Sequence, residues 1–167
     1  AYAAPFGIAP MGAAGICAYR SDLVFAQAAA AANVPMILSA ASLIRLEEVR
    51  AAGPTAWYQA YLMGDTSRIE PLVDRVAAAG YEVFVLTVDV PVSANRENNV
   101  RAGFSIPIKP SAKLAWDVMT HPGWSLGTFA RTVVQHGMPH FENSYATRGA
   151  PIIARRPPMS SRTAPAS

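Results

Sequence analysis

Four short apolar segments, each with the composition of a strand, recur through the first half of the sequence and constrain its fold more than any other feature. They are Phe6–Ala9, Met36–Ser39, Trp57–Leu62 and Val83–Val88. From centre to centre (Ile8, Ile37, Gln59 and Val85) they lie 29, 22 and 26 residues apart. Strand–helix–strand units of this length make right-handed parallel crossovers, so the sequence predicts a repeated βα fold. A doubly wound sheet and a (β/α)8 barrel both satisfy this pattern, and the spacing does not separate them.

The segments between these strands carry helix signals. Met36–Ser39 and Val83–Val88 are nearly continuous apolar runs, which is typical of parallel strands covered on both faces. Ser21 and Asp22 can cap a helix that continues through the alanine-rich run. A shorter helix is predicted at Leu46–Ala52, just before a Gly-Pro pair.

A third helix is predicted between the last two strands. Ser67 and Glu70 match a capping box ahead of a helix over Leu72–Ala79, and Gly80 stands where a helix ends. Pro71 falls in the first turn of this helix and shifts its start by a residue or two.

Charge and cysteine content exclude several classes of protein. Residues 1–142 hold 10 basic and 11 acidic side chains, so the net charge of +3 comes from four arginines in residues 143–167. A basic face for nucleic acid is therefore not expected. The single Cys17 excludes a disulfide scaffold and a multi-cysteine zinc module, and it indicates a reducing compartment. We expect Cys17 to be a small buried hydrophobic residue.

Residues 23–44 carry no charge, as a membrane span would, but Asn33 and Pro35 interrupt the run and alanine dominates its first half. The sequence predicts a helix, a turn and a buried strand there. A basic region followed by an apolar run is absent, so no targeting signal is expected.

The second half of the sequence departs from the βα pattern. Residues 109–145 are rich in Pro, Gly, His and Trp and are predicted to form a mobile, irregular loop of the lid type. Residues 146–167 are rich in Pro, Arg and Ser and are predicted to be disordered. These boundaries leave residues 1–108 for the βα units.

Polar side chains gather where the predicted strands end. Ser39 closes the second strand, Gln59 and Tyr61 alternate on the third, and Thr87 and Asp89 close the fourth. Residues two apart on a strand point to one face. Since ligands bind at the carboxyl ends of parallel strands, these side chains predict a binding site. The first strand leads instead into small residues that let the backbone approach a ligand. They include Pro10, Met11 and Gly12.

The motifs around these residues resemble the FMN-dependent α-hydroxy acid dehydrogenase/oxidase family, which includes L-lactate dehydrogenases, mandelate dehydrogenases and glycolate oxidase. The resemblance covers residues 5–108 and rests on FGIAPMG, ILSAAS, WYQAYL, LTVDVPV and NRENNVRAGF, in this order. Residues 121–143 (HPGW…HGMPHFEN) resemble the mobile segment of the dehydrogenase members. The resemblance implies an α/β fold, a (β/α)8 TIM barrel with FMN at its C-terminal mouth. This chain would supply the first four βα units, as a partial barrel.

The resemblance also implies roles for individual residues. The backbone of Pro10, Met11 and Gly12 would lie against the isoalloxazine ring, although Met11 replaces a threonine common in the family. Ser39, Gln59 and Thr87 would hydrogen-bond the polar edge of the flavin. Together with the backbone of the loop, they are the predicted cofactor-binding residues.

Three further residues would serve the substrate and the reaction. Tyr61 would place its hydroxyl on the substrate, and Arg96 would support the carboxylate of a 2-hydroxy acid. Asp89 would orient a catalytic histidine. Tyr61, Asp89 and Arg96 are therefore the predicted catalytic residues.

The histidine-glycine-glycine-arginine type motif of the family, its flavin-contacting lysine and its phosphate site are absent from these 167 residues. We therefore expect the isolated chain to be inactive. Because a half barrel leaves open sheet edges, we also expect it to self-associate, to aggregate or to need the complementary C-terminal half as a partner.

Other interpretations stay open. One is a non-catalytic flavin-binding or assembly half barrel. Another is a different FMN barrel enzyme, such as an isomerase or a nucleotide dehydrogenase, although Arg96 seven residues after Asp89 argues against it. His121, His136 and His140 are expected to be ordinary loop residues, with no metal site, and Trp57 and Trp116 to be packing groups.

The expected location is the cytoplasm. Residues 109–145 have only three basic side chains apart from histidine, too few for a basic amphipathic anchor, and the alternative is peripheral contact with the inner face of the membrane. The basic residues are Lys109, Lys113 and Arg131.

Overall fold

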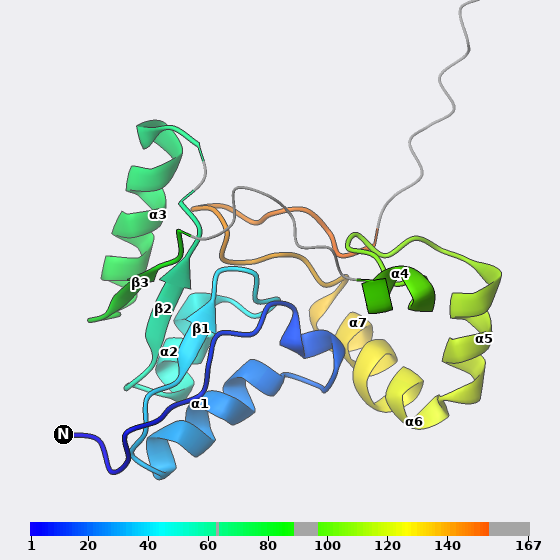
Figure 1. Ribbon diagram of the computed structural model, residues 1–167, viewed down its shortest axis with the longest axis horizontal. Coiled ribbons are helices and arrows are strands. Elements are labelled where there is room, and N and C mark those ends of the chain that lie inside the picture. Colours follow the sequence, from blue (N-terminus) through cyan, green and yellow to red (C-terminus); the bar gives the residue numbers. More distant parts are fainter. Residues whose placement is uncertain (63, 89–96, 154–167) are drawn as a thin grey trace, which may run out of the picture.

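The computed structural model describes residues 1–62, 64–88 and 97–153. A parallel three-stranded sheet forms one side of the molecule, and a group of helices lies beside it (Figure 1). The strands are β1 (Ile37–Ser39), β2 (Trp57–Ala60) and β3 (Phe84–Leu86), in the order β1-β2-β3. The predicted first strand contributes one parallel bridge, between Ile8 and Met36. The α/β architecture with parallel βα units is confirmed.

The first two predicted helices are present, but the cap predicted for the first of them is wrong: the N-cap of α1 is Arg20, it makes no side-chain cap hydrogen bond, and Ser21 and Asp22 lie inside the first turn. A short 3₁₀ turn, η1 (Ala14–Ile16), precedes α1 (Ser21–Ala31), and α2 spans Leu46–Ala52. Asn33 follows α1 with φ +50, a backbone conformation that asparagine tolerates better than most residues. The helix therefore ends just before Asn33, where the sequence predicts a turn.

The capping box predicted for the third helix is wrong. The helix α3 spans Thr66–Ala78, and its N-cap is Asp65. Ser67 lies inside the first turn, where its hydroxyl donates to Asp65 Oδ1 at 2.6 Å. Pro71 is tolerated inside the helix. The N-cap position thus lies two residues before the predicted serine, and Asp65 makes no side-chain cap hydrogen bond.

The hydrophobic core lies between the sheet and the helices α1–α3. Leu38 and Tyr58 are direct neighbours in the register of β1 and β2, and both are fully buried. They pack in one cluster with Leu46, Val49 and Val76. Since successive residues of a strand face opposite ways, Ser39 and Gln59 are left for the other face of the sheet.

The fourth predicted strand, Val83–Val88, is not covered on both faces. Phe84 is 37 % exposed, Leu86 50 % and Val88 82 %. Within the described ranges β3 is the edge of the sheet and pairs with β2 alone. The apolar sequence thus marks a strand whose outer side has no cover in this part of the chain.

The irregular loop predicted over residues 109–145 is wrong for most of its length, which is helical. Its helices are α5 (Ala112–Thr120), α6 (Pro122–Trp124), the π-helical η2 (Ser125–Ala130) and α7 (Arg131–His136). A short helix, α4 (Glu97–Ala102), lies before this segment. The Ser111 hydroxyl caps α5 by accepting from the Leu114 N–H at 3.1 Å. Pro122 occupies the first position of α6, where proline costs no hydrogen bond.

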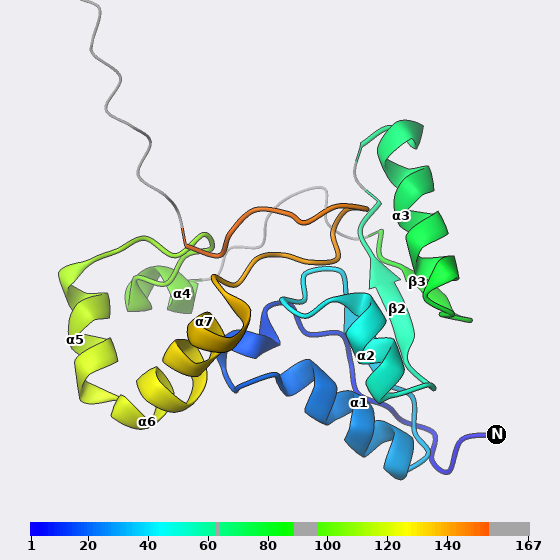
Figure 2. The ribbon, with the colours of Figure 1, turned by 180° about the vertical axis from the view of Figure 1, so that it is seen from behind.

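After α7 the chain returns across the molecule (Figures 1 and 2). An antiparallel bridge pairs His140 with Pro151, and a parallel bridge pairs Ile108 with Ile153. Ile152, between these two positions, is 2 % exposed. Residues 149–153 therefore pair with the rest of the chain, contrary to the predicted disorder, whereas Thr147 and Arg148 are exposed. The rest of that segment, 154–167, lies outside the described residues. Among the described helices, none has the length and apolar character that a bilayer crossing needs.

Candidate functional site

Three polar side chains form a hydrogen-bonded row at the carboxyl end of the sheet. Ser39 Oγ donates to Gln59 Oε1 at 3.3 Å, and Gln59 Nε2 donates to Thr87 Oγ1 at 2.8 Å. Ser39 is 3 % exposed and Gln59 1 %. The parallel register places Ser39 beside Gln59, while Thr87 immediately follows β3. The structure thus brings together three residues that the sequence placed on three separate strand ends.

The loop of Pro10, Met11 and Gly12 lies against the turn that follows Ser39. The Ala13 N–H donates to the Ala41 carbonyl at 2.8 Å, and the Ala41 N–H donates to Ser39 Oγ at 3.2 Å. A Cβ on Gly12 would lie 3.2 Å from the Cβ of Ala41, so this contact requires a small residue. The glycine therefore lets the loop approach the strand end that carries the row.

Of the three predicted catalytic residues, Tyr61 lies in the described part of the chain. Tyr61 lies just beyond β2, two residues after Gln59, and is 38 % exposed. Asp89 and Arg96 lie outside the described residues. Their predicted roles stay predictions.

A buried carboxylate supports the turn behind Ser39. Asp22, in the first turn of α1, is 2 % exposed, and Ser42 Oγ donates to its Oδ2 at 3.1 Å. Burial raises the pKa of Asp22. The Ser42 N–H donates to the Ser39 carbonyl at 3.0 Å, so Asp22 holds the turn that positions Ser39.

The segment that returns across the molecule after α7, residues 137–153, is called the returning segment below. It contributes a buried polar side chain that the sequence analysis does not predict. Asn143 is fully buried, its Oδ1 accepts from the Leu46 N–H at 2.8 Å, and its Nδ2 donates to the Ile44 carbonyl at 2.7 Å. The Tyr58 hydroxyl donates to the Asn143 carbonyl at 2.5 Å. These partners lie 85 to 99 residues away in sequence, and no local signal marks the asparagine.

Arg75 binds the same returning segment. Its guanidinium donates to both carboxylate oxygens of Glu47, at 2.7 and 2.9 Å. Its Nη1 also donates to the carbonyls of Glu142 and Tyr145, at 2.8 and 3.1 Å. The ion pair therefore links α2, α3 and the returning segment.

The Glu47–Arg75 pair predicts an acid-dependent stability. Its hydrogen bond with Arg75 lowers the pKa of Glu47 from 4.5 to about 2. The pair therefore contributes to the free energy of unfolding above pH 4.5, and that contribution is lost as the pH falls toward 2. In urea unfolding, we expect Glu47→Gln to lose about 1 kcal/mol at pH 7 and progressively less toward pH 2. Glu70→Gln, an exposed change on α3, is the control. A constant deficit for Glu47→Gln across this range would contradict the assignment.

The histidines form no common site in the described residues. His121 lies against the Asp117 carbonyl, His136 ends α7 beside Tyr19 and Arg20, and His140 lies against the Met138 carbonyl. No group of three metal-ligating side chains is present in the described part of the chain.

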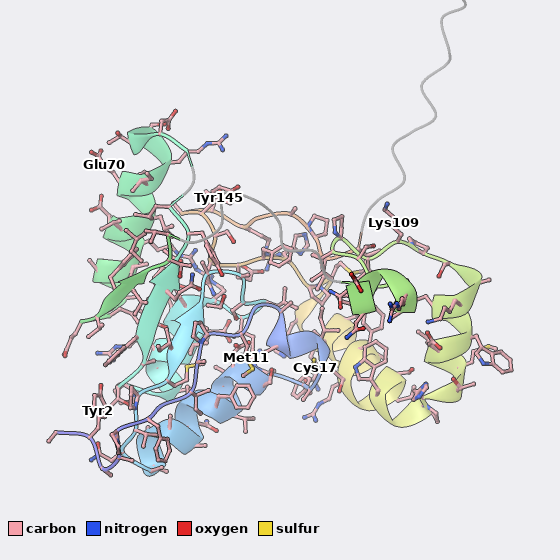
Figure 3. All side chains as sticks on the ribbon, in the orientation of Figure 1. Tyr2, Met11, Cys17, Glu70, Lys109 and Tyr145 are labelled. Carbon is pink, nitrogen blue, oxygen red and sulfur yellow. The ribbon has the colours of Figure 1, made fainter. Side chains whose placement is uncertain are left out.

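Two expectations about single residues are wrong. Cys17 is exposed, because it follows η1 on the loop ahead of α1 (Figure 3). Trp116 is 62 % exposed on α5 and is no core residue. Trp57, in contrast, is half-buried and its Nε1 donates to the Tyr2 hydroxyl at 2.8 Å.

The row and the loop together fit the polar edge of a flat heteroaromatic ring. The two hydroxyls can each donate or accept, and the amide between them offers one donor group and one acceptor. The loop of small residues leaves its backbone near the same strand ends. This donor set can hold a flavin by its pyrimidine edge, and in the described residues it supplies no metal site.

Comparison with known proteins identifies the family of this chain. The profile of the family described as "FMN-dependent dehydrogenase" matches residues 1–154. A putative L-lactate dehydrogenase of Mycobacterium tuberculosis is 41 % identical over 122 residues, covering 72 % of this chain and 30 % of the relative. The (S)-mandelate dehydrogenase of Pseudomonas putida is 36 % identical over 140 residues, covering 83 % of this chain and 34 % of the relative.

A solved structure, described as the monotopic membrane protein (S)-mandelate dehydrogenase, superposes with a TM-score of 0.70 and 35 % identity. The match covers 81 % of this chain and 35 % of that one. The chain thus spans about a third of the length of the relatives it matches. The profile match along almost the whole chain establishes that it belongs to the FMN-dependent dehydrogenase family.

Proposed function

We propose that this chain forms the part of an FMN-dependent dehydrogenase that holds the flavin ring, in an enzyme that oxidises an L-2-hydroxy acid to a 2-oxo acid. The observation that carries the proposal is the hydrogen-bonded row of Ser39, Gln59 and Thr87 at the carboxyl end of the sheet. The named relatives act on lactate or mandelate. A small hydroxy acid is accordingly the proposed substrate class.

Each residue has a proposed task. FMN, when bound, would supply a two-electron acceptor. Ser39, Gln59 and Thr87 would fix the plane of the ring through its polar edge, and the backbone of Pro10–Gly12 would lie against the ring. Bonds among the three side chains keep them oriented before the ring arrives, which lowers the ordering cost of binding.

The substrate would be held by residues beyond the strand ends. Tyr61 is exposed next to the row, so its hydroxyl could reach a bound hydroxy acid. We assign Arg96 to the substrate carboxylate and Asp89 to the orientation of a catalytic histidine supplied from outside these 167 residues. A guanidinium suits a carboxylate because it stays charged and can donate two parallel hydrogen bonds.

We infer that the C-terminal half barrel is the partner of this chain. The open edge of β3 and its exposed apolar side chains support this inference, because such edges pair with further strands. Phe84 and Leu86 would then become buried. Without that partner we expect no turnover, and we expect self-association through the same edge.

Flavin titration tests the proposal. We expect the chain to quench the fluorescence of FMN and of riboflavin with similar affinity, because the row addresses the ring and not the phosphate. Addition of L-lactate or (S)-mandelate should leave the bound flavin oxidised. Absence of any binding would contradict the ring-holding role, and bleaching by either acid would contradict the predicted inactivity.

A non-catalytic flavin-binding or assembly module is the second candidate, because the exposed edge of β3 would also suit a docking role. Co-expression with the C-terminal half of the (S)-mandelate dehydrogenase of Pseudomonas putida separates the two. Restored bleaching of bound FMN by (S)-mandelate supports the enzyme fragment. Stable binding of the two halves without bleaching supports the module.

We propose a cytoplasmic location with peripheral contact at the inner face of the membrane. The support is the apolar surface of the helices α5 to α7, called the helical segment below, where Trp116 is 62 % exposed, Met119 68 % and Leu126 69 %. A related solved structure is described as monotopic.

Vesicle flotation tests this location. We expect the chain to float with phosphatidylethanolamine–phosphatidylglycerol vesicles. The double variant Trp116→Ser, Leu126→Ser should bind the vesicles at least about tenfold more weakly, because serine buries far less apolar area in the membrane than tryptophan or leucine. Val24→Ser, at an exposed valine on α1, is the control. Equal binding of all three proteins would place the contact elsewhere.

A further inference from the structure

An apolar cavity of about 260 Å³ lies between the helical segment and the loops around η1 and β1. Its wall combines side chains from the loop regions with others from α5, η2 and the returning segment. The main wall residues are Ile16, Leu43, Leu114, Val118, Phe129 and Ile152. This cavity is distinct from the row of Ser39, Gln59 and Thr87, none of which lines it.

Two polar side chains of this wall have partners inside the protein. Trp124 Nε1 donates to the Ile16 carbonyl at 2.6 Å, and Thr132 Oγ1 donates to the Thr128 carbonyl at 2.7 Å. Among the described residues, no charged side chain lines the cavity. A polar ligand would therefore lose hydrogen bonds to water without replacing them, whereas an apolar ligand would not.

A second cavity, of about 160 Å³, adjoins the first and is charged. Both cavities are lined by Gly15, Leu43, Thr132 and Pro139, so they meet at a common wall. The charged residues of the second cavity are three arginines, one histidine and two glutamates, an excess of positive charge. They are Arg20, Arg45, Arg148, His136, Glu48 and Glu142.

The arginines retain capacity for an anion. Arg20 pairs with Glu48 and its Nη1 contacts the His136 ring, and Arg148 Nε donates to Glu142 Oε1 at 2.8 Å. A guanidinium has five N–H donors, so these partners leave donors for a further acceptor, most of all on Arg148. Arg148 is 57 % exposed and is open to solvent on that side.

We propose that the two cavities form one site for an amphipathic anion with a single aliphatic chain, of which a fatty acid is the simplest example. The chain would occupy the apolar cavity and the carboxylate would face Arg148 and Arg20. Apolar cavities of about 150 Å³ bind benzene, so the larger apolar cavity of this chain can hold an apolar group with more carbon atoms than benzene. This site is independent of the flavin proposal.

Fluorescence of cis-parinaric acid, which rises when its chain enters an apolar site, tests this inference on the full chain. We expect saturable binding that Val118→Phe weakens at least about tenfold, because the larger side chain fills the cavity. Val134→Phe is the matched control, since Val134 is 84 % exposed on α7 and does not line the cavity. Leu114→Phe repeats the test from another wall position if Val118→Phe lowers the urea midpoint.

The charged end is tested separately. Arg148→Gln and the methyl ester of parinaric acid should each weaken binding several-fold, and vesicles with parinaroyl phosphatidylglycerol distinguish a membrane lipid from the free acid as the source. Equal binding by Val118→Phe and Val134→Phe, or ester binding as tight as that of the acid, would overturn the proposal. Neither result would bear on flavin binding, which has its own readout.

Discussion

Replacement of Gln59 by leucine is expected to weaken FMN binding by about tenfold to a hundredfold. The Gln59 side chain joins Ser39 to Thr87 through two hydrogen bonds and is 1 % exposed, so no other group can take its place. Leucine has similar size but leaves two hydroxyls without their shared partner, at a cost of about 1–3 kcal/mol. The dissociation constant from flavin fluorescence quenching measures the effect.

The matched control for this substitution is Gln27→Leu, on the exposed side of α1. It makes the same chemical change away from the row and should leave the dissociation constant unchanged. Far-UV circular dichroism of both variants checks that the fold is retained. If Gln59→Leu binds FMN as tightly as the original chain while remaining folded, the row does not hold the ring.

Replacement of Asn143 by alanine is expected to lower the free energy of unfolding by about 2–4 kcal/mol. The substitution leaves the Leu46 N–H at the start of α2 without a partner in a buried position, and it leaves the Ile44 carbonyl with only the Ser42 hydroxyl, at 3.3 Å. It also removes the side chain that fixes the Asn143 carbonyl opposite the Tyr58 hydroxyl. Urea unfolding followed by circular dichroism measures the loss.

Asn98→Ala serves as the control for this stability effect, because Asn98 is exposed on α4. Its effect should stay within about 0.5 kcal/mol, as for most surface substitutions. Equal midpoints for Asn143→Ala and Asn98→Ala would mean that the returning segment does not anchor α2. The same result would also mean that residues 141–145 do not contribute to the stability of the fold.

Local signals predicted much of the βα region. The bounds of α2 and the end of α1 follow from apolar periodicity and from breakers such as Gly53 and Asn33, which act within one or two turns of helix, whereas the predicted Ser21/Asp22 cap of α1 is absent. The row at the sheet end follows from a geometric rule: parallel strands bring their carboxyl ends to one edge, so Ser39, Gln59 and Thr87 meet there.

Long-range contacts account for what the sequence did not predict. Asn143 acts through partners 85 to 99 residues away. The helices α5–α7 are not predicted because the Pro, Gly, His and Trp content of residues 109–145 indicates an irregular loop, whereas a proline at the first position of a helix, as Pro122 is in α6, is tolerated. The exposure of β3 depends on which strands surround it, which no residue within the strand encodes.

The central claim is that the polar edge of a flavin meets the row at the carboxyl end of the sheet. Titration of the ¹⁵N-labelled chain with FMN, followed through the side-chain amide signals, tests it most directly. The account predicts that the Gln59 amide and the Gly12 backbone N–H shift in a saturable way while the Gln27 amide stays in place. Saturable shifts at Gln27 or in α5–α7, with the Gln59 and Gly12 signals unmoved, would contradict it.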